Sequence, residues 1–196
     1  MSSAYWRINP VSIIGAAIAM ISVFLPWWGI YELFGSSRLL LGHWALWNPP
    51  GAGALRRLGR PETFSAASTS QIFTISSVIV LVLALVVASL ALAGGLTLLR
   101  KYLVAGLVVS ILTPIAYTIM IAYVTSNYCL TPVCAAGPIG STSLFDGTTF
   151  TWGLETGFYL FIVAIVVLAL SLALNNSLAR TTERTEITVP AGQAAR

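Results

Sequence analysis

Four apolar stretches, separated by polar segments, organise this chain. The two longest, residues 72–99 and 102–123, contain no charged residue and are separated only by Arg100 and Lys101. About 20 residues at 1.5 Å each cross the ~30 Å hydrocarbon core of a bilayer, so either stretch is long enough to span it. Neither carries the polar stripe of a soluble amphipathic helix. We therefore predict a transmembrane helical hairpin with a tight turn at Arg100 and Lys101.

Two further apolar stretches flank this hairpin, at about residues 10–29 and 154–174. Pro10 suits the first turn of a helix. Trp27 and Trp28 lie at the end of the first of these stretches, and Trp152 lies just before the second. Tryptophans in such positions are typical of the aromatic belt at a membrane interface. The alternative for the first stretch is a cleaved signal peptide. The predicted interfacial anchors are Trp27, Trp28 and Trp152.

The expected fold class is an all-α membrane protein, with four transmembrane helices in an antiparallel bundle and an ordered outer cap. Residues 1–174 form one domain in this interpretation, and residues 175–196 form a polar cytoplasmic tail. The protein is expected in the cell membrane as a multi-pass protein. Basic residues are more frequent near the termini and the hairpin turn than in the two loops, which places the termini in the cytoplasm and loops 31–70 and 124–153 outside.

Composition supports lipid as the solvent. The chain is 57% apolar and 8% charged, whereas soluble domains are about 25% charged. The net charge of +4 is scattered along the chain rather than clustered on one basic face. This excludes nucleic acid as a partner.

The first long loop, residues 31–70, combines an apolar and aromatic piece with basic residues. Asn48-Pro49-Pro50-Gly51 interrupts it with a strong turn signal. Loops beyond about 12–15 residues are usually functional or disordered. The aromatic piece is too short to span, which leaves an interfacial helix, a pair of short strands, or a segment packed across the bundle mouth. We expect an outer-loop interface formed by His43, Trp44, Trp47, Arg56 and Arg57.

Small residues recur along one face of the 72–99 stretch. Their spacing allows another helix to approach closely, which is how membrane helices gain packing contacts. The 10–29 stretch has a weaker version in Ser12, Gly15, Ala19 and Ser22. The partner helix belongs either to the same chain or to another chain. The predicted helix-packing seam is Ala84, Ala88, Ala91 and Gly95.

The candidate reactive residues are few. Cys129 and Cys134, with four residues between them, lie in an outer loop where the environment is oxidising, and we predict a structural disulfide. A redox pair is more typically Cys-x-x-Cys, and a zinc site needs two further ligands. His43 is the one histidine and is interpreted as a packed or interfacial residue. We expect no catalytic residue, no cofactor and no metal.

Apart from Glu155 at the first turn of the last stretch, where the helix dipole favours a carboxylate, the four stretches contain no Asp, Glu, Lys, Arg or His. This argues against proton-coupled carriers and voltage sensors. The expected function is a non-catalytic accessory or structural subunit of a larger membrane complex, or a self-assembling four-span protein. Its partners would be other integral membrane subunits or copies of itself, together with membrane lipids. The alternative is a small channel or carrier for a neutral solute or lipid.

In outline this plan resembles the claudin-like tetraspan proteins. Trp44-Ala45-Leu46-Trp47 is loosely similar to their Trp-Gly-Leu-Trp segment. The cysteine pair of their first loop is missing, and the Cys-Cys-Gly of tetraspanins is also absent from the sequence. The resemblance covers architecture and implies a role in contacts between neighbouring molecules.

Overall fold

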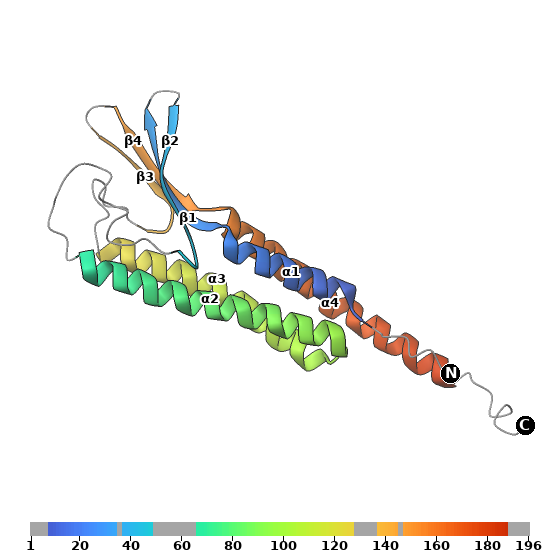
Figure 1. The fold of residues 1–196 in the computed structure, drawn as a ribbon. Helices are drawn as coiled ribbons and strands as arrows, with labels where there is room; N and C mark the ends of the chain where they lie inside the picture. The colour runs from blue at the N-terminus through green and yellow to red at the C-terminus, as the bar shows by residue number, and fades with distance from the viewer. Residues whose placement is uncertain (1–7, 35–36, 49–65, 128–136, 145–146, 188–196) are drawn as a thin grey trace, which may run out of the picture.

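The computed structural model describes residues 8–34, 37–48, 66–127, 137–144 and 147–187. Within these ranges it has the helices α1 (Pro10–Phe24), α2 (Ala66–Thr97), α3 (Arg100–Asn127) and α4 (Thr156–Ile187), and one four-stranded sheet (Figure 1). Three segments are long and apolar enough to cross a membrane, namely Phe73–Thr97, Arg100–Thr125 and Thr156–Asn175. The chain is therefore mostly helical and compatible with a membrane, as the sequence predicts.

The prediction of a span over residues 10–29 is wrong for its last five residues, 25–29. Helix α1 has 15 residues and ends at Phe24, and Leu25 is already extended. Pro26 explains this end, because its ring disfavours the helical conformation of the preceding residue. Fifteen residues rise about 22 Å, which is less than the ~30 Å hydrocarbon core. Among the described helices α1 is thus a short apolar one beside three long ones.

The sheet corrects the all-α prediction. It consists of β1 (Pro26–Phe34), β2 (Ser37–Ala45), β3 (Gly140–Ser143) and β4 (Thr149–Leu154) in the order β2-β1-β4-β3. Every neighbouring pair is antiparallel. The aromatic piece of the first loop lies mainly in a single strand, β2, and its partner β1 begins at Pro26, inside the stretch predicted to span. Because β1 pairs with β4, the segment after α1 and the segment before α4 form one sheet, which extends beyond the ends of α1 and α4 (Figure 1).

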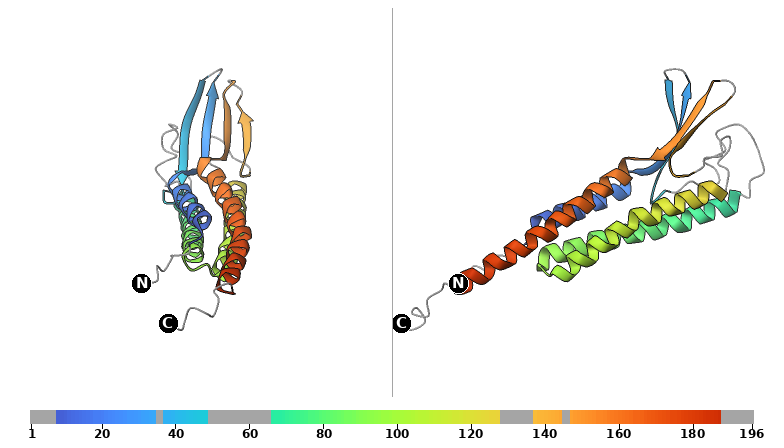
Figure 2. Two further views of the ribbon diagram at one scale, coloured as in Figure 1. Left: turned by 90° about the vertical axis from the view of Figure 1, so that its right-hand side faces the viewer. Right: turned by 180° about the vertical axis from the view of Figure 1, so that it is seen from behind.

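The helices pack as two neighbouring pairs. α2 and α3 form a helical hairpin, and α1 lies along α4 while also contacting α2 (Figures 1 and 2). The contact between α1 and α4 is close at Gly15, where an added Cβ would lie 2.9 Å from Leu168 Cδ2. Helix α4 runs on to Ile187, beyond the predicted limit at residue 174.

The predicted seam on α2 is buried inside this chain. Ala84, Ala88, Ala91 and Gly95 are all buried. A Cβ added at Gly95 would lie 3.1 Å from Ser12 Cβ on α1, and the Ser12 hydroxyl donates a hydrogen bond to the Ala91 carbonyl. At these positions the seam therefore joins two helices of the same chain, and a lipid-facing seam is excluded.

Candidate interaction surface

The two faces of the sheet differ in chemistry. Directly opposed residues of antiparallel strands lie on the same face. Trp28 pairs with Trp44 and Leu154, and Ile30 pairs with Trp152, so aromatic and apolar side chains share one face. The other face is mainly polar and carries Tyr31, Arg38, His43, Ser141, Thr149 and Thr151. The sheet is therefore amphipathic.

The aromatic face is buried close to the helices. Trp28 stacks on Trp44 with ring centroids 5.4 Å apart and an interplanar angle of 25°. The Trp28 indole donates to the Pro138 carbonyl at 2.9 Å, and the Trp152 indole donates to the Gly137 carbonyl at 3.2 Å. These bonds hold the segment before β3 against the sheet, which allows the two indole N–H groups to be buried.

Trp27 fixes the sheet to the helices. Its ring is fully buried among Tyr117, Phe158 and Phe161, with centroid distances of 5.1, 5.7 and 5.3 Å. Its indole donates to the Ser22 carbonyl at 2.8 Å. Strand β1 thus begins with a side chain inserted between α3 and α4.

The predicted interfacial anchors therefore have a different environment from the expected one. Trp27, Trp28 and Trp152 are all buried by the protein itself and are not exposed to lipid. The sequence cannot reveal this, because a tryptophan at the end of an apolar stretch suits both a membrane interface and a packed core.

Glu155 lies between the sheet and α4. Its backbone N–H donates to the Trp27 carbonyl at 3.0 Å. Its carboxylate accepts a hydrogen bond from the Tyr31 hydroxyl. Arg38 lies over the Tyr31 ring, with its Cζ 3.7 Å from the ring centroid. Burial raises the pKa of Tyr31, the hydrogen bond and the negative charge of Glu155 raise it further, and Arg38 lowers it. Glu155 thus does more than complement the helix dipole, since it also links the sheet to α4.

Apolar side chains are exposed at the end of the sheet farthest from the helices. Phe34 is 66% exposed and Leu39 is 60% exposed, and Leu40 and Leu144 are exposed as well. We call Phe34 and Leu39 the distal patch. They lie on one face at the end of the β1–β2 hairpin, because Phe34 pairs with Ser37, two residues before Leu39. In water such side chains favour contact with another apolar surface.

The predicted interface residues are only partly associated with this patch. Trp44 is half-buried against Trp28, while His43 and Trp47 are exposed nearer to the helices. Arg56 and Arg57 lie outside the described residues, as do Cys129 and Cys134, so the disulfide stays a prediction.

The sequence interpretation missed the distal patch and the Tyr31–Glu155 contact. A signal for the β1–β2 hairpin is present in Gly35-Ser36, which separates two apolar runs. The exposure of Phe34 and Leu39 has no such local signal, because it depends on how the sheet lies relative to the helices.

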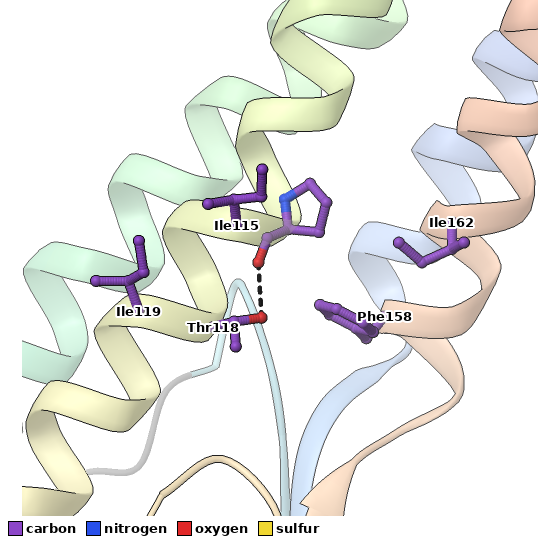
Figure 3. A pocket seen from close by; sticks show the side chains of 6 residues that line it. Ile115, Thr118, Ile119, Phe158 and Ile162 are labelled. Atoms are coloured by element: carbon purple, nitrogen blue, oxygen red, sulfur yellow. Dashed lines mark hydrogen bonds between the residues drawn. The ribbon is translucent and has the colours of Figure 1, made fainter.

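A second candidate site is an open apolar groove of about 360 Å³ between α3 and α4 (Figure 3). It is lined by Pro114, Ile115, Thr118, Ile119, Phe158 and Ile162. Its one hydroxyl, on Thr118, donates to the Pro114 carbonyl at 2.8 Å. The groove therefore offers apolar surface and no free side-chain donor.

Comparison with known proteins adds no functional information. The chain matches no protein-family model, no curated protein and no solved structure. In the described part of the chain no group of three His, Cys, Asp or Glu side chains is placed to hold a metal ion.

Proposed function

We propose that this is a non-catalytic integral membrane protein that acts by contact, as an accessory subunit of a membrane complex or as a self-assembling protein. The distal patch is the observation that carries the proposal. Exposed Phe and Leu side chains in an aqueous compartment are unfavourable unless another surface covers them. In this proposal the covering surface belongs to another membrane subunit or to a second copy.

The attachment of the sheet supports this role. Trp27 and Glu155 hold β1 against α3 and α4. A surface on a rigid support loses little conformational freedom when it binds, so more of the contact energy contributes to affinity. A sheet on a flexible linker would lack this advantage.

The proposed topology has the sheet outside and the termini in the cytoplasm. Asn9 N–H donates to the Gly95 carbonyl, and the Asn175 amide donates to the Leu98 carbonyl. These bonds place the start of α1, the α2–α3 turn and Asn175 of α4 at one end of the helices, opposite the sheet. Arg100 and Lys101, in the first turn of α3 directly after this turn, favour the cytoplasmic side. The proposal keeps four helices in the membrane, with the short helix α1 packed along α4 and α2. It keeps a claudin-like plan at the level of architecture only.

The test is to remove apolar area from the distal patch and measure assembly in a mild detergent. Burying a Leu or Phe side chain contributes ~1.5–3 kcal/mol, and 1.4 kcal/mol corresponds to a tenfold change in affinity. We expect Phe34→Ser and Leu39→Ser each to weaken assembly about tenfold or more. The control Ser141→Asn, at the opposite edge of the sheet, should leave assembly unchanged. Light scattering during size-exclusion chromatography measures the assembled mass.

An unchanged mass in both patch variants, with their thermal stability intact, would remove the support for this function. A wild-type chain that is monomeric and makes liposomes permeable to a neutral solute would favour the channel or carrier instead.

The groove between α3 and α4 favours one version of that alternative, a protein that binds a lipid chain. Its apolar lining belongs to two segments long enough to span, so hydrocarbon would be its solvent. Its volume lies near the lower limit of small-ligand pockets. Ile162→Trp should fill the groove, and mass spectrometry of co-purified lipid would then show a loss relative to the wild type.

A further inference from the structure

Buried polar side chains gather at the end of the helices opposite the sheet. Asn9, directly before α1, donates from its backbone N–H to the Gly95 carbonyl at 2.8 Å and from its side-chain amide to the Ser171 carbonyl at 3.1 Å. Asn175, one turn further along α4, donates to the Leu98 carbonyl at 3.2 Å. This polar clasp, defined as Asn9, Leu98, Ser171 and Asn175, joins α1, α4 and the α2–α3 turn.

Two oxygens of the polar clasp have no partner. They are the Ser171 hydroxyl oxygen and the Asn175 amide oxygen, on residues that are 0% and 3% exposed. Residues four apart on a helix lie on the same face, so both oxygens belong to one side of α4. Buried polar atoms in native proteins nearly always have a hydrogen-bond partner, from the protein or from ordered water.

The chemistry of these two atoms limits what can bind them. An amide oxygen only accepts hydrogen bonds, so the ligand has to donate them or be a cation. A cation is disfavoured by charge, because two helices, α1 and α3, begin at this end and only α2 ends there, and because Arg100 and Lys101 lie in the first turn of α3. Glu32 and Glu155 belong to the sheet and its junction, and the acidic residues of α4 at this end, Glu183 and Glu186, begin eight residues beyond Asn175. The ligand is therefore neutral.

The burial of the two residues also limits the size of the ligand. Both residues are almost fully buried, which leaves no path for a large group. We propose that one buried water molecule binds here and donates hydrogen bonds to Ser171 Oγ and Asn175 Oδ1. Buried waters typically bridge otherwise unsatisfied polar groups in this way. The water completes the clasp that holds α1, a helix too short to cross the hydrocarbon core by itself.

The direction in which Ser171→Ala changes stability tests the proposal. With the water present, Ser171→Ala removes one of its partners and should lower the ratio of folded to unfolded protein roughly fivefold. Without it, Ser171→Ala replaces an unpartnered hydroxyl by an apolar group and should raise that ratio. The control is Ser110→Ala on α3, a buried serine whose hydroxyl donates to the Leu107 carbonyl at 2.8 Å. It gives the cost of losing one satisfied hydroxyl.

Two further measurements separate water from other occupants. An experimental density map that resolves ordered water should show a peak within hydrogen-bond distance of both oxygens, and this peak should be lost in Ser171→Ala. Thermal stability in sodium chloride should equal that in choline chloride at the same concentration. A stabilising Ser171→Ala, a map without the peak, or stabilisation specific to sodium would each overturn the proposal.

Discussion

Replacing Gly157 by alanine tests how the sheet is attached to the helices. Gly157 lies in the first turn of α4, under the start of β1. An added Cβ would lie 2.6 Å from Trp27 Cδ1, 2.7 Å from the Leu25 carbonyl oxygen and 2.8 Å from the Pro26 carbonyl oxygen. All three contacts are shorter than a Cβ tolerates, and two of them involve backbone that a side-chain rotation cannot relieve.

Two opposing effects decide the magnitude. Alanine favours the helix by up to ~1 kcal/mol over glycine. Overpacking a well-filled site typically costs ~1–3 kcal/mol. The Trp27 ring is held by Tyr117, Phe158 and Phe161 and by its bond to the Ser22 carbonyl, so it cannot move aside without losing those contacts. We therefore expect a net destabilisation of about 1–2 kcal/mol.

The assay is thermal unfolding in a mild detergent, where 1 kcal/mol corresponds to roughly 2–4 °C in melting temperature for a chain of this length. Gly106→Ala on α3 is the matched control, because its Cβ would meet Leu90 Cβ at 3.3 Å, with the next atom at 3.6 Å. We expect that control to melt within a few degrees of the wild type. A Gly157→Ala variant as stable as the wild type, beside a well-behaved control, would mean that β1 does not approach α4 this closely.

Four further outcomes are expected. Ala88→Leu should lower the melting temperature through overpacking of ~1–3 kcal/mol, and it should leave the assembled mass unchanged because Ala88 is buried within one chain. The raised pKa of Tyr31 contributes stability that is fully present below its ordinary pKa of 10.0 and is lost as the pH rises through the folded value, so the wild type should lose more stability than Tyr31→Phe in melting curves recorded above pH 10. Mass spectrometry without reduction should show two hydrogens fewer on the peptide containing Cys129 and Cys134, and free thiols there would contradict the predicted disulfide. A cysteine introduced by Thr181→Cys should resist membrane-impermeant thiol reagents in intact cells, whereas labelling would reverse the proposed topology.

The long helices could be predicted because their signal is local. The length of an uncharged apolar run and the 1.5 Å rise per residue decide whether a segment can span, and neither depends on the rest of the fold. The turn between the two helices was predicted at Arg100 and Lys101 and lies two residues earlier, at Leu98 and Leu99, since Arg100 and Lys101 already belong to α3. The seam on α2 could also be predicted, since small residues at helical spacing favour close packing. The helix that packs against the seam could not be predicted, because α1 and any other helix with small residues satisfy the same pattern.

The sheet and its surface depended on the tertiary structure. Strands β1 and β4 are separated by more than half of the chain, and their pairing leaves no mark in either strand alone. Packing also determines whether the tryptophans are buried. Trp27 is buried because α3 and α4 bring Tyr117, Phe158 and Phe161 around it. Phe34 and Leu39 are as apolar as the core residues and remain exposed because the sheet extends beyond the ends of α1 and α4. Hydrophobicity along a chain indicates which side chains avoid water, and only the arrangement of the elements determines which of them are covered.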